Sequence, residues 1–518
     1  MPVNQWTLKY HILMILFITL SFLFYPCYLY SKEEPSENSK TDLLLQEKEL
    51  FNEWTKKLGR ISEKCDELGM KLEGQICRRY QLPSLEYGFV FSHIPAKKWI
   101  RELPSDASDN QIHWLNAFHR LRKKYGDSFY QLAEQALKEK KGYDAFRLYY
   151  LALSIDSDHE SSRKRCGYTI LNDRWCSPFE KKQIEKGLID HPKFGWISAD
   201  NAARYENGER FFLGKWISAD EETRLRRKQK IGWKIETEHY SMSTTHSLEE
   251  GVRIIRKLEN FYQAWTRLFY RFMARENQWT ASLLSGRRLD IKKHKIILYP
   301  SRQEYLQEMK ILDPSGHIES SHGGYFPDIN CICVYVPGES EAGDLEIMLI
   351  HEATHQLFQE CRFEQESVRR SKSGSGPILQ NFWLLEGIST YMETFVDDGI
   401  YYHVGGLRSL RFERAKERCA EPDGYLPLEE YSKLSMIGFQ TWKNVSMLYT
   451  QAAGLTLFLL HKNEGEYRNA FISTLYAVYE RMDSPRTLEI LCKKSFADLD
   501  EEYKRFMMDL PFSRRDLP

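Results

Sequence analysis

The chain has 518 residues, of which 28% are charged and 42% are hydrophobic, with 73 basic and 73 acidic side chains. This composition excludes a polytopic membrane protein and a disordered chain, and a formal net charge of zero offers no whole-chain attraction for nucleic acid. At ~150 residues per domain, the length predicts about three folding units.

An uncharged, almost wholly apolar run of nineteen residues, 12–30, lies behind Lys9. A membrane-spanning helix needs ~20 such residues, whereas the apolar part of a cleaved signal peptide has about 7–15. No small-residue cleavage site follows, so we expect residues 1–31 to direct export and to stay as a membrane anchor, with a cleaved signal as the alternative. In both cases the remaining chain is expected outside the cytoplasm, in the periplasm or at the cell surface.

Ten cysteines are spread along the chain, and none belongs to a C-x-x-C pair. A zinc ribbon and a thioredoxin-type motif are therefore absent from the sequence. In an exported protein, Cys65 with Cys77 and Cys166 with Cys176 would each close a short loop. The other interpretation is that these residues are small buried thiols, and the sequence leaves both open.

Residues 32–106 are predicted to form a helical linker region, with a polar start and then one helix from Leu43 to about Arg78. Residues 107–160 have the pattern of a tetratricopeptide-like helical hairpin that turns near Gly142. A single hairpin of this kind cannot bury its own apolar face. We therefore expect it to pack on neighbouring helices.

Residues 161–230 contain a short repeat, in which Trp175, Trp196 and Trp216 recur at steps of 21 and 20 residues. Each Trp is followed by a Ser that can cap a helix. The pattern predicts a short strand with a buried indole and then one or two helical turns. One interpretation is a recognition module for peptide or cell-wall polymer, and the other is a Trp-stabilised linker between domains.

The pattern changes again over residues 235–512, where strands and helices follow one another and predict an α+β domain. Strands are expected at 235–241, 296–299 and 329–336, with a long amphipathic helix at 248–275. Ser301 and Glu304 form a capping box for the next helix. Asp344 is placed to cap the helix that follows the last of these strands.

That helix contains His351-Glu352-Ala353-Thr354-His355, an H-E-x-x-H motif with apolar neighbours on both sides. Residues four apart share a helix face, so both imidazoles can reach one metal ion. Glu352 is one position round from His351, where it can take a proton from water as a general base. The motif predicts a metal-dependent hydrolase. The preceding strand at 329–336 is expected to be the edge strand that pairs with an extended peptide.

A catalytic zinc ion needs a third protein ligand. The metzincin extension fails, because Phe358 and Cys361 occupy the places of its Gly and His. Glu386 is the better third ligand, since it lies in an apolar helix that we expect to begin at Pro377 and a carboxylate there needs a partner. Glu393 and Asp397 are its rivals.

The segments HEATHQLF and WLLEGISTYME resemble those of gluzincin metallopeptidases. In order, TEHY, ILYPSRQEYL, GGYFPDINCICVYV, WLLEGIS and LYTQAAGLTLFL are similar to a peptidase-MA-like domain of exported bacterial proteins. The similarity covers about residues 235–479. It implies a gluzincin fold with Zn²⁺ held by His351, His355 and Glu386, and with Glu352 as general base.

The resemblance also implies that the hydroxyl of Tyr449 stabilises the oxyanion, whereas the plain alternative is a packed helix aromatic. The chain departs from the family in three ways. Thr390 replaces the Asp that orients a ligand histidine, the charged segment 361–377 makes the ligand spacing longer, and GGYFPD lacks the Glu that holds a substrate's free amine. The last difference favours cleavage within a chain over aminopeptidase activity.

The sequence therefore predicts an exported or membrane-anchored zinc metallopeptidase that acts on a peptide or protein substrate. The alternative is a non-catalytic extracytoplasmic binding scaffold with a structural metal site. Of the other histidines, His239 is interpreted as a strand or core residue, His317 and His322 as loop residues, and His403 as lying near the site helix without ligand spacing. Asp397-Asp398 is interpreted as an exposed helix end.

Overall fold

The computed structural model describes residues 37–82, 84–95, 102–312, 323–338, 344–361 and 380–512. The chain divides into two compact parts, residues 1–53 and 54–518. The apolar run 12–30, Cys27, Pro377, His317 and His322 lie outside the described residues. Within the described ranges, every helix is too short or too polar to cross a membrane.

The first helices confirm the predicted hairpin but split the helix expected from Leu43 to Arg78. That helix is interrupted at Gly69, whose φ of +72° is left-handed, a conformation that glycine adopts without strain. The hairpin packs on a helix that comes much later in the chain, since the ring centroids of Phe146 and Trp279 are 4.2 Å apart. The helices of this region are α2 Glu37–Glu67, α3 Lys71–Tyr80, α4 Asp109–Lys138, α5 Gly142–Ile155, α6 Glu160–Arg165 and α11 Glu276–Ser285.

A strand within the region predicted to be a helical linker is the largest departure from the expected domain boundaries. Strand β1, Gly88–Ser92, pairs antiparallel with β14, Tyr401–Gly405, which also pairs with β13, Val396–Asp397. Segments more than 300 positions apart thus share one small sheet. The domain that carries the motif consequently begins before residue 235.

The Trp repeat forms three β-hairpin–helix units, so the second strand and helix of each unit are as predicted and the first strand was missed. Trp175 is buried, as predicted, whereas Trp196 and Trp216 are only half-buried. Trp196 packs edge-on against Phe179 of the first unit, and Trp216 packs edge-on against Tyr205 of the second. The elements are β2 Thr169–Leu171, β3 Arg174–Cys176, α7 Pro178–Glu185, β4 Leu188–His191, β5 Gly195–Ser198, η1 Ala199–Asn201, α8 Ala202–Glu206, β6 Glu209–Phe212, β7 Lys215–Ser218 and α9 Ala219–Gln229.

A five-stranded sheet in the order β11-β12-β10-β9-β8 forms the centre of the site-bearing region. Strands β9, β10 and β12 are parallel, and the two edge strands are antiparallel to their neighbours. The strand predicted at 235–241 is instead two strands joined by a tight turn. The elements are β8 Trp233–Glu236, β9 Tyr240–Thr244, α10 Leu248–Met273, β10 His294–Tyr299, α12 Arg302–Leu312, β11 Gly323–Phe326, η3 Pro327–Ile329 and β12 Cys331–Tyr335.

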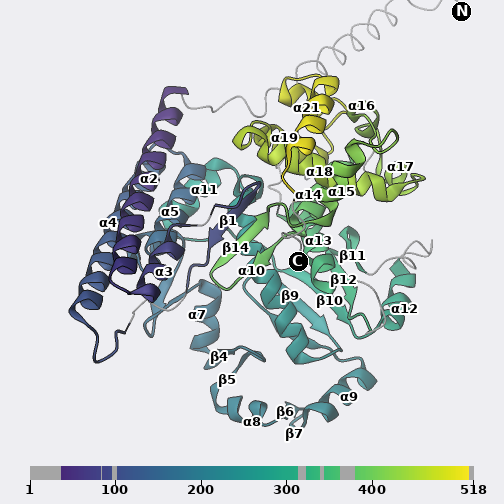
Figure 1. Ribbon diagram of the computed structural model, residues 1–518. Coiled ribbons are helices and arrows are strands. Elements are labelled where there is room, and N and C mark those ends of the chain that lie inside the picture. The colour runs from purple at the N-terminus through teal and green to yellow at the C-terminus, as the bar shows by residue number, and fades with distance from the viewer. Residues whose placement is uncertain are drawn as a thin grey trace, which may run out of the picture. The chain divides into compact units, whose positions relative to one another are not determined.

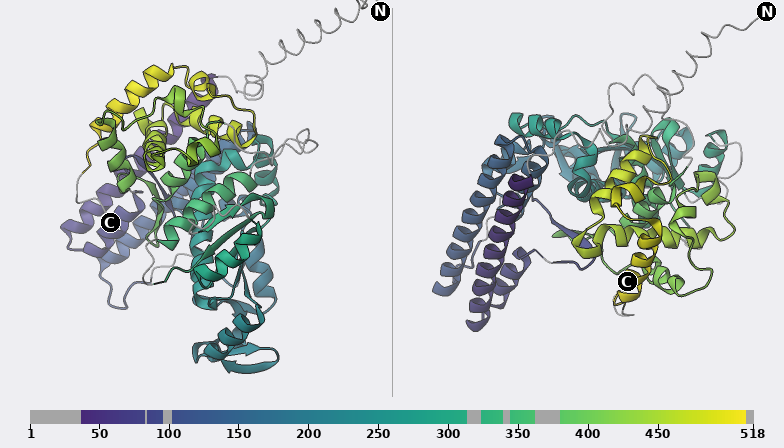
Figure 2. Two further views of the ribbon diagram at one scale, coloured as in Figure 1. Left: turned by 90° about the vertical axis from the view of Figure 1, so that its right-hand side faces the viewer. Right: turned by 90° about the horizontal axis from the view of Figure 1, so that it is seen from above.

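The C-terminal helices cover the side of the site helix that faces away from the sheet (Figure 1). In Figure 2 they lie at the opposite end of the sheet from the hairpin–helix units. Gly387 lets α14 and α18 approach closely, since a Cβ there would lie 2.5 Å from Thr456 Oγ1. The helices are α13 Leu345–Glu360, α14 Trp383–Met392, α15 Leu410–Cys419, α16 Leu428–Tyr431, α17 Met436–Gln440, α18 Val445–His461, η6 Lys462–Glu464, α19 Arg468–Tyr479, α20 Thr487–Cys492 and α21 Phe496–Asp509.

The chain is thus a mixed α and β protein, as the sequence predicts in its coarse outline. The described cysteines are all free thiols, which fits the second of the two interpretations left open above. Helix α14 begins at Trp383 and not at Pro377.

Candidate metal centre

Helix α13 carries the H-E-x-x-H motif between the sheet and α14. Its start is capped as predicted, because the carboxylate of Asp344 accepts hydrogen bonds from the backbone N–H groups of Glu346 and Ile347 at 2.8 and 3.3 Å. Leu349, Ile350 and Leu357 are buried and anchor the helix in the core. The opposite face therefore holds both histidines in fixed positions.

Helix α14 brings Glu386 to these histidines. Nitrogen Nε2 of His351 lies 3.3 Å from one oxygen of Glu386, and Nε2 of His355 lies 3.8 Å from the other. The two Nε2 atoms are 3.2 Å apart. One ligand atom from each of the three residues lies within 4.8 Å of the others, so the structure brings together the three predicted ligands.

The hydrogen bonds on the far side of each imidazole leave lone pairs in the centre of this cluster. His351 Nδ1 lies 2.8 Å from a carboxylate oxygen of Glu393, which can only accept a hydrogen bond, so Nδ1 carries a proton, and Nε2 has a lone pair for a metal ion when the ring is neutral. His355 Nδ1 lies 3.4 Å from the hydroxyl of Ser389, which suits the same tautomer. Two bare nitrogens and a carboxylate that face one another repel unless a cation or a proton lies among them.

The charge of the buried Glu386 carboxylate also indicates that the cluster attracts positive charge. Glu386 is 5% exposed, and its Oε2 has no hydrogen-bond partner among the described residues. Burial alone would raise its pKa, but the charge of His355 and hydrogen bonds with both histidines hold that pKa well below its ordinary value. Burial would lower the pKa of His351, yet hydrogen bonds with Glu386 and Glu393 raise it to about 10. The cluster favours positive charge at its centre, as a divalent-cation site does.

Glu393 has a different role from the one weighed in the sequence. It was a rival third ligand, but its carboxylate accepts from Nδ1 of His351 on the outer side of the ring and from Nε of Arg411 at 3.1 Å. Thr390, four residues after Glu386, instead donates to the carbonyl of Gly387 at 2.9 Å. Glu393 therefore supplies the support that Thr390 lacks. Its place seven residues, or two turns, beyond Glu386 is the signal by which sequence reasoning could have found it.

We predict that Glu393→Gln weakens metal binding by about 10–100-fold, because a neutral amide no longer fixes the imidazole tautomer or raises its basicity. The measurement is competition with a chromophoric chelator. Glu360→Gln is the matched control, since Glu360 lies on the helix of His351 and pairs with another histidine, His294, at 2.7 Å, away from the cluster. Equal affinities in Glu393→Gln and wild type would show that the contact does not position the ligand.

Glu352 faces the edge of the sheet, next to the cluster. One of its oxygens accepts a hydrogen bond from the backbone N–H of Tyr325, in β11, at 2.7 Å. The prediction that the strand at 329–336 forms the edge is wrong, because β12 lies between β11 and β10. Among the described strands, β11 lies at that edge, and it places a row of backbone groups beside the candidate base.

Tyr449, on α18, interacts with the carboxylates of Glu386 and Glu352. Burial raises the pKa of its hydroxyl, and the charges of Glu386 and Glu352 and a hydrogen bond with Glu386 raise it further. Its ring packs edge-on against Phe439. Tyr431 is fully buried, and its hydroxyl donates to the carbonyl of Leu448 at 2.6 Å. Of these two tyrosines, only Tyr449 has a hydroxyl whose pKa is raised by both Glu352 and Glu386.

The remaining residues weighed in the sequence lie elsewhere. Asp397 pairs with His93 at 2.8 Å in β13, which corrects its interpretation as a helix end, and Asp398 pairs with His403 at 3.0 Å. Cys361 contacts His294 and not the metal cluster. His239 is not a plain core residue, since it forms a second His/Glu group with Glu238 and Glu259.

The site thus combines a cation-attracting cluster, a carboxylate beside it and a tyrosine hydroxyl, all next to a sheet edge. This arrangement can hold a divalent metal ion and can support acid–base chemistry at a carbonyl group. No family model matches the sequence, and no curated protein is significantly similar to it.

Proposed function

We propose that the protein is a zinc-dependent metallopeptidase of the gluzincin type, which cuts within peptide chains. The observation that carries this proposal is the convergence of His351, His355 and Glu386, with Glu352 beside them at the sheet edge. Two imidazoles and one carboxylate are the donor set of many catalytic zinc sites. A purely structural ion would have no need of Glu352. An ion held here would polarise the carbonyl of a bound peptide and make water more acidic.

The residues of the chain would then act as follows. An extended substrate pairs with the free edge of β11, which aligns its scissile carbonyl near Glu352. Glu352 takes a proton from water as the water oxygen bonds to the carbonyl carbon. It passes that proton to the amide nitrogen as the C–N bond breaks, which leaves a carboxylic acid and a free amine. Tyr449 donates a hydrogen bond to the carbonyl oxygen while that oxygen is negative.

Internal cleavage is favoured because Gly323–Phe326 carries no acidic side chain to hold a free amino terminus. The test uses full-length protein, an internally quenched peptide blocked at both ends, and leucine p-nitroanilide. We expect hydrolysis of the blocked peptide alone, loss of activity with 1,10-phenanthroline, and recovery with Zn²⁺. Hydrolysis of the anilide alone would make the enzyme an aminopeptidase. No metal-dependent cleavage of either substrate would favour a binding scaffold.

Tyr449→Phe is predicted to lower kcat by about 10²–10³-fold with little change in KM, because the lost hydrogen bond forms only when the oxygen carries charge. Steady-state kinetics on the blocked peptide measure this effect. Tyr431→Phe is the control, since that hydroxyl bonds the backbone. Unchanged turnover in Tyr449→Phe together with a lower Tm would mean that Tyr449 only packs.

We also propose that the apolar run 12–30 exports the protein and anchors it to a membrane. A reporter active only outside the cytoplasm, fused after Lys40, is expected to be active, and the full-length protein is expected to sediment with membranes. Reporter activity only in a cytoplasm-specific fusion would overturn the proposal.

A further inference from the structure

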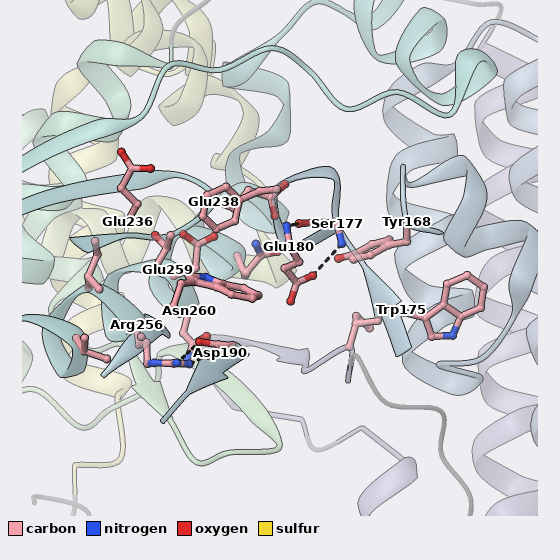
Figure 3. A pocket seen from close by; sticks show the side chains of 18 of the residues that line it. Tyr168, Trp175, Ser177, Glu180, Asp190, Glu236, Glu238, Arg256, Glu259 and Asn260 are labelled. Carbon is pink, nitrogen blue, oxygen red and sulfur yellow. Dashed lines mark hydrogen bonds and ion pairs between the residues drawn. The ribbon is translucent and has the colours of Figure 1, made fainter. Parts of the chain in front are cut away.

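A pocket of about 340 Å³ lies between the first two hairpin–helix units, the β8–β9 turn and helix α10 (Figure 3). None of the metal-centre residues lines it. A pocket of this size suits a small molecule or the end of a chain. The hairpin–helix units, which the proposed peptidase chemistry does not use, form one of its walls.

The acidic side chains in this pocket are all paired with basic side chains. Five carboxylates line it, and each has a basic partner in the structure. The pairs are Glu180 with Arg174 at 2.8 Å, Asp190 with Arg256, Glu236 with Lys293 at 2.9 Å, Glu238 with Arg288 at 2.6 Å, and Glu259 with His239 at 2.5 Å. The carboxylates therefore leave little negative charge to attract a cationic ligand.

Two arginines that line the pocket have no such compensation. Arg163 is fully buried and donates to the backbone carbonyls of Ser157, at 2.8 Å, and of Pro95. Arg267 donates to the carbonyl of Ser92. Neither has a carboxylate partner among the residues that the structure describes. Arg163 is buried and Arg267 is half-buried. A guanidinium that is removed from water without an anion is costly, so this pair of charges favours an anionic guest.

The buried polar atoms that lack a partner are all of one kind. Among the described residues lining the pocket, they are Nη1 of Arg163, Nε1 of Trp175, Nε of Arg256 and Nε of Arg267. Each is an N–H donor, and none is an acceptor. A ligand that satisfies them must bring acceptor oxygens.

Aromatic rings hold these donors and shape the rest of the pocket. The guanidinium of Arg163 lies over the rings of Tyr168 and Trp175, with centroids at 4.8 and 5.5 Å. Burial raises the pKa of the nearby Cys166 thiol to about 12, while the positive charges of Arg288, Arg163 and Arg267 lower it. A stacked, planar guanidinium with free N–H groups is the usual partner of a carboxylate.

We propose that this pocket binds an organic carboxylate, with the carboxylate at Arg163 and Arg267 and an uncharged remainder against the aromatic side chains. Two sources present this chemistry: the free C-terminus of a peptide and a sugar acid. The side-chain amides of Asn260 and Gln263, which also line the pocket, suit the amide or hydroxyl groups of either source. The site would serve recognition and does not depend on the proposed peptidase activity.

The test is calorimetric titration of full-length, chelator-treated protein, so that hydrolysis plays no part. The probes are N-acetyl-alanyl-alanine and its C-terminal amide, and glucuronate and its methyl ester. We expect at least one acid to bind. Its neutral counterpart should bind at least about tenfold more weakly, since each hydrogen bond to a charged group that is lost costs that much or more. Binding of the peptide acid alone, or of glucuronate alone, identifies the source.

Arg267→Gln is expected to weaken binding of that acid about tenfold. Arg204→Gln is the control, since it removes the same charge from a guanidinium that lies over an aromatic ring, Trp216, but pairs with Glu209 at 2.8 Å and does not line the pocket. If Arg267→Gln does not fold, the comparison of acid with neutral probe on wild type still decides. Equal binding of acids and neutral probes, or no binding of either acid, would overturn the proposal.

Discussion

Replacing Glu352 by Gln is expected to leave the metal bound and to lower peptide hydrolysis by at least about 10²–10⁴-fold. Glu352 is not one of the three ligands, and its carboxylate contacts the backbone of β11 instead. An isosteric amide keeps that space filled but cannot accept the proton of water. It also cannot return a proton to the leaving amine, so both halves of the reaction suffer.

The measurement pairs metal analysis with kinetics on the blocked peptide, using the same preparations of wild type, Glu352→Gln and Glu360→Gln. The last of these removes a carboxylate from the same helix without touching the cluster, and should hydrolyse the peptide as wild type does. Hydrolysis at the wild-type rate in Glu352→Gln would mean that another group is the base or that a contaminant causes the activity.

Glu386→Gln or His351→Ala is expected to abolish stoichiometric metal binding. A tight catalytic site needs three protein ligands, and either change leaves only two strong donors. Because metal binds the folded chain, added Zn²⁺ should raise the Tm of wild type and leave that of either variant unchanged. Elemental analysis after dialysis and a thermal melt with and without Zn²⁺ measure the two effects.

His239→Ala provides the control for this experiment, since His239 pairs with Glu259 in the other His/Glu group. His239→Ala should keep the Zn²⁺-dependent rise in Tm. If Glu386→Gln keeps one tightly bound ion, the third ligand is elsewhere. If His239→Ala loses it, the ion belongs to the second group.

Local pattern was enough to predict much of the site. The four-residue spacing of His351 and His355 places both on one face of a helix, and the carboxylate cap at Asp344 marks where that helix begins. Glu386 was predictable because a charged residue in an apolar helix needs a partner, and the structure supplies two histidines.

What was missed depends on contacts distant in sequence. The pairing of β1 with β14 leaves no local mark, because a five-residue apolar strand fits many neighbours. The order of β11 and β12 could not be read either, since alternation indicates a strand and not its place in a sheet. The first strands of the hairpin–helix units are only three or four residues long, too short for a recognisable period.

The role of Glu393 shows the same limit within a single helix. Its spacing from Glu386 places both on one face, but the sequence does not tell which side of the His351 ring each reaches. The structure separates them: Glu386 lies at Nε2 and Glu393 at Nδ1. Only that separation distinguishes a ligand from the residue that orients one.

Titration of chelator-treated, full-length protein with Zn²⁺, with hydrolysis of the blocked peptide followed at each addition, tests the central claim most directly. The three candidate ligands form one cluster that could hold one ion, so the rate should rise linearly and stop at about one Zn²⁺ per chain. Glu386→Gln should show no rise over the same range. Full hydrolysis by the metal-free protein, or a rise in Glu386→Gln equal to that of wild type, would contradict the account.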